Sequence, residues 1–263
     1  MVNAPSWSMA HDNIVGALEV FGSTAVDGEA EHLDGVLTFA SSRTFPGPFQ
    51  IGALRDDASV DPVHVLERAR GFFGPRSLAF CLWTAPDDED LIAAAEADGF
   101  GRVGDVPVMV ASQRVVLPDT PNDVELRRIG NDDGTLTAEL AAMADVTYAA
   151  TGTPAGTIAA QLTPAFFAHP AVHTVVALIG GEVAAAAMTV TANGSASVHF
   201  VATAAAHQRR GLAALVTAAV TDDAFDAGAA QVSLQASDEG YRVYERLGFE
   251  DLGRYSFWLG FVS

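Results

Sequence analysis

An internal repeat constrains the fold of this chain more than any other feature of the sequence. Short matches recur at one offset of 149 residues, pairing Gly99-Phe100 with Gly248-Phe249, Gly104 with Gly253, and Val108 with Phe257. Apolar runs and turn residues also follow one another in a similar order in the two halves. Because self-similarity at a fixed offset is typical of repeated structural units, we predict a duplicated fold.

The segment between the two copies is rich in turn-forming residues. The run from Pro118 to Asp123 places two prolines and several turn formers between two apolar, periodic stretches. We therefore predict a first domain over residues 1–117, a linker over 118–122 and a second domain over 123–263.

Apolar periodicity predicts a mixed α/β fold with a central sheet flanked by helices. In the second half we expect strands at 124–129, 174–179, 182–191, 196–202, 231–236 and 253–261, and helices at 134–149, 155–168, 209–227 and 239–247. The first half repeats the later part of this order, with strands at 36–40, 49–54 and 78–83, a strand ending near 110, and helices at 62–73 and from 88 onward.

The composition is that of a globular, strongly acidic protein. Of the 263 residues 49% are apolar, which suffices for a buried core, and the formal net charge is −19 with arginine as the only strongly basic residue type. An acidic surface repels phosphate backbones, so nucleic acid is not an expected partner. The same field would attract cationic amines, but acidic surfaces are common on soluble proteins, and both interpretations stay open.

No segment indicates a membrane, secretion or a metal. The apolar runs are shorter than the ~20 residues that span a bilayer, and charged or polar residues interrupt the first 30 positions, unlike a signal peptide. The single cysteine, Cys81, excludes a disulfide framework and a thiolate metal cluster. We interpret the acidic run 87–90 as a helix cap, and we expect a cytoplasmic protein without a metal.

The most informative segment predicts a strand, a loop and the first turn of a helix. An apolar strand ends at Thr203, and the helix begins with Arg209, Arg210 and Gly211. A first helical turn presents unpaired N–H groups and about half a positive charge, which favour an anion such as a pyrophosphate. Gly211 would let the backbone approach the phosphates, and the arginines would add charge-assisted hydrogen bonds. The alternative is an ordinary helix start with two solvated arginines.

Two motifs in the second half resemble the GNAT superfamily of N-acetyltransferases. The run from Gln208 to Ala213 is similar to the family's Gln/Arg-x-x-Gly-x-Gly/Ala signature, between a strand and a long helix. The run from Ser237 to Phe249 resembles the family's closing segment, in which a tyrosine precedes a Gly-Phe pair. The resemblance covers residues 124–259. It implies the GNAT-type acyl-CoA N-acyltransferase fold, intact in the second half and degenerate in the first.

The resemblance also implies an acetyl-CoA site without a metal. Backbone groups of Val201 and Thr203 would bind the pantetheine arm. The pyrophosphate would be held by Gln208, Arg209, Arg210, Gly211, Leu212, Ala213 and Ala214. Ser237 stands where many family members have an asparagine that contacts coenzyme A, and this difference weakens its assignment.

Direct transfer of the acetyl group to a primary amine is the reaction that the resemblance implies. Tyr244 occupies the family's position for the acid that protonates the departing thiolate, although packing is the alternative role. His199 is a candidate base because its ordinary pKa suits proton transfer, although a buried strand histidine is more often structural. Strand alternation predicts that His199 shares a face with Val201.

The first half lacks these features. Ala95 stands at the position equivalent to Tyr244, and the helix that begins near Pro62 has no pyrophosphate signature. We therefore expect no second cofactor site there. The expected partners are acetyl-CoA and an amine acceptor, and a homodimer is left open. The competing function is a non-catalytic acyl-CoA-binding or regulatory module that keeps the GNAT fold.

Overall fold

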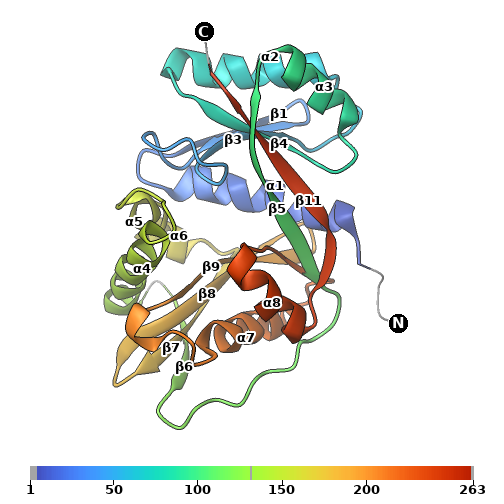
Figure 1. Cartoon of the computed structure of the whole chain (residues 1–263). Coiled ribbons are helices and arrows are strands. Elements are labelled where there is room, and N and C mark those ends of the chain that lie inside the picture. Colours follow the sequence, from blue (N-terminus) through green and yellow to red (C-terminus); the bar gives the residue numbers. More distant parts are fainter. Residues whose placement is uncertain (1–4, 131, 262–263) are drawn as a thin grey trace.

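The computed structural model describes residues 5–130 and 132–261. The first half supplies α1 (Trp7–Thr24), β1 (Glu29–Leu33), β2 (Val36–Ala40), β3 (Ile51–Arg55), α2 (Pro62–Phe73), η1 (Gly74–Arg76), β4 (Phe80–Thr84), α3 (Glu89–Ala97) and β5 (Gly101–Ala111). The second half supplies β6 (Glu125–Ile129), α4 (Gly134–Ala149), α5 (Thr157–Gln161), α6 (Pro164–Ala168), β7 (Val172–Ile179), β8 (Glu182–Ala192), β9 (Ser195–Thr203), η2 (Ala205–His207), α7 (Leu212–Asp226), β10 (Val232–Gln235), α8 (Asp238–Leu247) and β11 (Glu250–Gly260). The predicted mixed α/β class is confirmed, because these strands form one sheet flanked by helices (Figure 1).

Three regions differ from the expected elements. α1 and β1 had not been predicted. The expected helix at 155–168 is divided into α5 and α6, because Thr163 caps a new helix that begins with Pro164. The helix expected from Arg209 begins at Leu212, because Arg209 and Gly211 adopt left-handed backbone conformations that an α-helix does not contain.

The eleven strands in the described part of the chain form a continuous sheet in the order β1-β2-β3-β4-β11-β5-β10-β9-β8-β7-β6. β11 lies between β4 and β5, and β5 lies between β11 and β10. In Figure 1 these two strands, red and green, run side by side along the length of the molecule. Each half of the sheet therefore contains the last strand of the other half of the chain.

The pairing of β5 with β11 supports the internal repeat. The residue pairs are Gly104 with Phe257, Val106 with Tyr255, and Val108 with Gly253. Replacing each residue by its counterpart 149 positions away exchanges the first pair with the third and leaves the middle pair unchanged. A local twofold axis therefore passes through the centre of this strand pair, as a duplicated unit requires.

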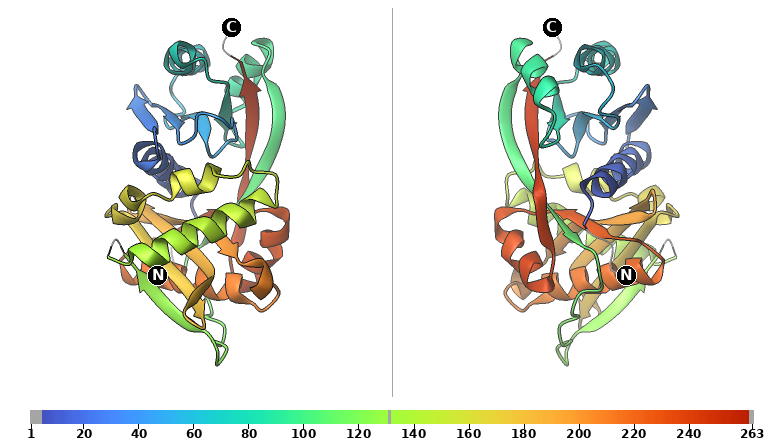
Figure 2. Two further views of the ribbon diagram at one scale, coloured as in Figure 1. Left: turned by 90° about the vertical axis from the view of Figure 1, so that its left-hand side faces the viewer. Right: turned by 90° about the vertical axis from the view of Figure 1, so that its right-hand side faces the viewer.

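α1 lies between the two halves of the molecule (Figure 2). It packs on β8 and β9 on one side and on β1 and β2 on the other. The Asn13 side-chain amide donates to the carbonyls of Val190, Ala192 and Ser195. Gly16 allows the close approach, since an added Cβ would lie 2.6 Å from the Ala192 Cβ. The N-terminal helix is thus part of the core of the second half.

The sheet of the second half has two faces with different partners. Val198 of β9 and Leu234 of β10 pack in the apolar cluster that includes α7, and we call this side the α7 face. Phe200 and Ala202 of β9 pack with residues of α1, α4 and α6, and we call this side the α1 face. None of the helices in the described residues is both long and apolar enough to cross a membrane.

Candidate active site

The sheet opens between β9 and β10. The two parallel strands pair from Ala196 with Val232 to Val198 with Leu234, where the pairing ends. β9 continues to Thr203 along β8, whereas the chain after β10 follows β5 instead, since the Ala236 amide donates to the Pro107 carbonyl. The edge of β9 after Val198 therefore borders an opening in the sheet.

Val201 and Thr203 lie on the edge that borders this opening. The Ala204 amide donates to the Ala184 carbonyl of β8. Because peptide groups alternate in direction along a strand, those of Val201 and Thr203 point to the other side, toward the opening. The Thr203 carbonyl also accepts a long hydrogen bond of 3.5 Å from Thr147 of α4. An extended ligand can add to this edge as a further strand does.

The loop before α7 leaves the first amides of that helix free. Arg209 and Gly211 have φ angles of +61° and +78°, and no side chain caps the helix. The first helical hydrogen bond runs from the Leu215 amide to the Gly211 carbonyl. The preceding amides, those of Leu212, Ala213 and Ala214, therefore lie ahead of the helical pattern with the positive end of the helix dipole. This arrangement suits an anion.

The arginines of this loop have different surroundings. Nη2 of Arg210 donates to both oxygens of the Asp123 carboxylate, each at 2.8 Å. This ion pair lowers the pKa of Asp123. Arg210 thus ties the loop to the start of the second half. Arg209 and Gln208 are exposed, so their side chains are accessible to a ligand.

Tyr244 is held in the interior by the short helix α8. Ser237 caps this helix by accepting a hydrogen bond from the Gly240 amide at 3.1 Å, so its hydroxyl has a structural role. Gly240 leaves room for the phenol, since an added Cβ would lie 2.8 Å from the ring. Tyr244 packs beside Phe249 and in the cluster that contains the last paired residues of β9 and β10. Burial raises the pKa of Tyr244 to about 12, so the phenol stays protonated at neutral pH.

His199 lies on the opposite face from the one expected. Phe200 has a φ of +50°, and the register of β9 against β8 shifts at this point, as in a β-bulge. His199 contacts Phe21 of α1 edge to face, with ring centroids 4.9 Å apart, whereas Val201 packs on the α7 face. The prediction that His199 and Val201 share a face was wrong, because the bulge breaks the alternation.

Ser197 is the hydrogen-bond partner of the His199 ring among the described residues. The His199 Nε2 lies 2.6 Å from the Ser197 hydroxyl, and the side chain is 8% exposed. Burial lowers the pKa of His199 to about 3, so the ring is neutral at neutral pH. The imidazole can therefore exchange hydrogen bonds, but it is a weak proton acceptor.

Tyr148 is a further residue at the opening that sequence reasoning missed. It comes from α4, and its ring lies 6.4 Å from that of Phe200. Burial raises the pKa of Tyr148, and the charge of an ionised Tyr244 would raise it further. The predicted helix at 134–149 includes Tyr148, but no motif in the sequence marked this tyrosine as a site residue.

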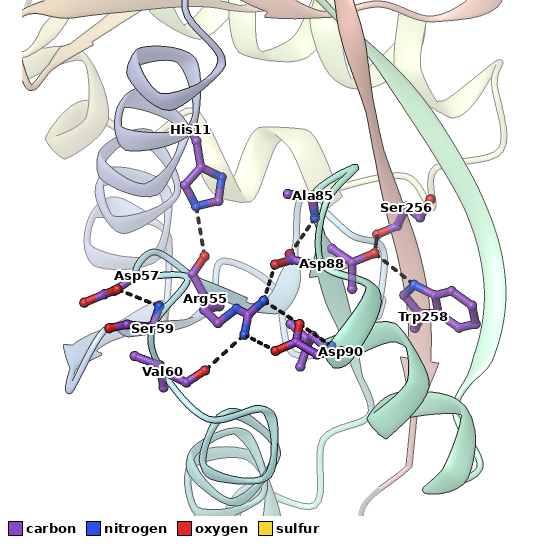
Figure 3. Close-up of polar contacts among 12 residues, drawn as sticks. His11, Arg55, Asp57, Ser59, Val60, Ala85, Asp88, Asp90, Ser256 and Trp258 are labelled. Atoms are coloured by element: carbon purple, nitrogen blue, oxygen red, sulfur yellow. Dashed lines mark hydrogen bonds and ion pairs between the residues drawn. The ribbon is translucent and has the colours of Figure 1, made fainter.

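The corresponding region of the first half contains an ion cluster (Figure 3). Arg55, at the end of β3, is 5% exposed and donates to Asp88, to both oxygens of Asp90 and to the Val60 carbonyl. The loop that follows carries Asp56 and further aspartates instead of arginines. These features support the expectation that the first half has no second acetyl-CoA site.

Known proteins share this fold. A family model described as Acetyltransferase (GNAT) family matches residues 140–249. No curated protein matches the chain. A GCN5-related N-acetyltransferase from Kribbella flavida superposes with a TM-score of 0.68 at 22% identity, over 97% of this chain and 96% of that one. Another from Sphaerobacter thermophilus has a TM-score of 0.61 at 14% identity, over 99% and 95%.

A third solved structure is a tandem GNAT protein from the clavulanic acid biosynthesis pathway. It superposes with a TM-score of 0.61 at 15% identity, over 87% of this chain and 78% of that one. The duplicated order of elements and the match of the family model to the second half agree with this likeness. The chain therefore has a tandem GNAT fold, and residues 140–249 of its second half match the GNAT family model.

Proposed function

We propose that this chain transfers the acetyl group of acetyl-CoA directly to a primary amine at the opening between β9 and β10. The observation that carries the proposal is the buried phenol of Tyr244, which belongs to the same apolar cluster as the last paired residues of these strands. The free edge at Val201 and Thr203 would bind the pantetheine arm. The amides that begin α7 would bind the pyrophosphate, with Gln208 and Arg209 within reach.

In this reaction the amine nitrogen bonds to the thioester carbonyl carbon, and the bond from that carbon to sulfur breaks. The sulfur leaves with the electron pair and takes the phenolic proton of Tyr244. An apolar surrounding disfavours a free thiolate for the same reason that it raises the pKa of Tyr244, so a proton donor at this place lowers the barrier. The proton of the attacking amine passes to a water molecule or to His199.

His199 stays a candidate for this second proton transfer. Its neutral ring can accept a hydrogen bond from the amine or from a water molecule, while Ser197 fixes the orientation of the ring. Its lowered pKa favours a role in holding the amine or water over a role in keeping the proton.

The test is Tyr244→Phe, with Tyr241→Phe as the matched control on the same helix. The Tyr241 hydroxyl donates a hydrogen bond of 3.0 Å to Asp251 at the surface, so Tyr241→Phe should not affect the rate. We expect Tyr244→Phe to lower kcat roughly 100- to 10,000-fold with an unchanged Kd for acetyl-CoA. Thiol release would be followed with a panel of small primary amines, and Kd by calorimetry.

Two other results are informative. Tight acetyl-CoA binding without turnover of any amine would favour the non-catalytic acyl-CoA-binding module. Equal rates for Tyr244→Phe and the wild type would remove Tyr244 from the mechanism and leave the phenol a packing role.

A further inference from the structure

Two glutamines at the ends of β10 differ in a way that packing does not explain. Gln231, just before the strand, has both amide atoms paired with Ser6, which donates to Oε1 at 3.0 Å and accepts from Nε2 at 2.9 Å. Gln235, the last residue of the strand, has Oε1 and Nε2 both shielded from solvent and both without a partner among the described residues. Leaving a buried polar group unpaired costs about 1–3 kcal/mol, so a ligand that pairs with the amide of Gln235 would recover this free energy.

Gln235 lies at the opening and on the α1 face. Strand alternation places Gln231, Ser233 and Gln235 on one face of β10, opposite Leu234, which belongs to the α7 face. Ser233 is level with Ser197 in the parallel pairing of β10 and β9. The next residues on this face are Gln235 of β10 and His199 of β9. Each is one residue past the last strand pair, Leu234 with Val198.

These four side chains form a polar strip under an apolar cover. The strip consists of Ser197, His199, Ser233 and Gln235. Ser197 and His199 bond to each other, whereas the Ser233 hydroxyl is fully buried and unpaired like the Gln235 amide. Phe21 of α1 covers the histidine. The strip contains no group that is charged at neutral pH, so it suits an uncharged polar ligand and not an ammonium ion.

We propose that Gln235 binds the reacting groups of the acceptor reaction, accepting a hydrogen bond from the amine with Oε1 and donating one to the acetyl carbonyl with Nε2. In the tetrahedral adduct the nitrogen and the oxygen are bound to one carbon, and a carboxamide can contact both at once. The inference rests on the proposed function. It adds that the acceptor binds as a neutral primary amine. During the reaction the nitrogen loses one proton and keeps one N–H group, which donates to Gln235.

The experiment compares Gln235→Met with Gln231→Met, which remove the same group from the two ends of one strand. With the fastest substrate of the amine panel, Gln235→Met should raise KM for the amine and lower kcat, each on the order of tenfold. The Kd for acetyl-CoA should change less than KM. Gln231→Met should keep wild-type kinetics.

Thermal unfolding gives a readout that does not depend on activity. Gln235→Met replaces an unpaired amide with an apolar chain of similar size, so Tm should stay constant or rise. Gln231→Met removes two hydrogen bonds and leaves the Ser6 amide unpaired, while the Ser6 carbonyl keeps its bond from the Ala10 amide, so Tm should fall. Opposite effects of the two variants on Tm and on kinetics support the proposal.

The inference and the proposed function fail in different ways. Wild-type kinetics in Gln235→Met, in a protein that does acetylate amines, would overturn the role of Gln235 alone. A fall in Tm equal to that of Gln231→Met would also overturn it, since Gln235 would then be a structural residue. A wild-type protein that acetylates none of the amines would contradict the proposed function itself, whatever the Tm values.

Discussion

Burial, and not pairing with charges, controls the protonation of the two side chains assigned to proton transfer. It raises the pKa of Tyr244 to about 12 and lowers that of His199 to about 3. At neutral pH the phenol keeps its proton and the imidazole lacks one. Tyr244 is therefore ready to act as an acid. Both side chains depend on the apolar packing of α1, α4 and α8 around the opening.

The same burial makes His199 a source of acid sensitivity. Its folded pKa lies below the value of about 6.5 in an unfolded chain, so between these values only the unfolded state takes up the proton. The free energy of unfolding should then fall as the pH falls below about 6.5, by at most about 1.4 kcal/mol per pH unit from this residue. Urea unfolding between about pH 7 and pH 5 should show a steeper loss in the wild type than in His199→Gln. Equal slopes would mean that His199 is not the buried neutral group described here.

At the scale of elements, α7 offers a matched pair of glycines. Gly211 precedes the helix and Gly228 follows it, and both have positive φ angles with open space where a Cβ would lie. Gly211→Glu and Gly228→Glu therefore introduce similar backbone strain and the same charge at opposite ends of the helix. Only Gly211→Glu places a carboxylate at the expected pyrophosphate site.

We expect Gly211→Glu to weaken acetyl-CoA binding more than about 100-fold, and Gly228→Glu to leave the affinity within about threefold of the wild type. Calorimetric titration measures both. The wild type should bind one acetyl-CoA per chain, because in the first half Arg55, paired with Asp88 and Asp90, stands at the end of β3, the strand that corresponds to β9. Equal losses in the two variants would indicate general damage to α7, and two bound molecules would contradict the role given to Arg55.

The elements that the sequence predicted well are those with one buried side or a strong local signal. The loop before α7 was predictable because the groups proposed to bind the pyrophosphate are backbone amides close together in the sequence. α1 was not predicted, since it is buried between two sheet halves and its buried residues include neighbours such as Ile14 and Val15. Such a helix has no single apolar stripe to detect.

The arrangement of the acceptor side could not be predicted for a different reason. The bulge at Phe200 turns His199 toward Phe21, a residue that lies far away in the sequence. Neither a bulge nor a long-range packing partner leaves a periodic pattern. The unpaired amide of Gln235 likewise became visible only when every neighbouring partner was known.

At the scale of the whole molecule, the exchange of β5 and β11 joins the two halves more firmly than a linker would. The predicted linker lies in the irregular connection between β5 and β6, after the last strand of the first half. A cut at 118–122 divides the sequence into its two copies, but it leaves β11 paired with β4 and β5, and β5 paired with β10. Main-chain hydrogen bonds therefore hold the halves together without a covalent connection.

This arrangement predicts the behaviour of a cleaved chain. A protease site inserted between Pro118 and Asp123 should be cut readily, because this connection carries no sheet pairing. The two fragments should still elute together in size-exclusion chromatography and bind acetyl-CoA with wild-type affinity. They should separate only when urea also unfolds them, because each fragment supplies a strand to the middle of the other's sheet. The urea midpoint should lie below that of the uncut chain and rise with protein concentration. Fragments that separate in native buffer, with the second half still binding acetyl-CoA, would show that each copy folds without the strand it receives.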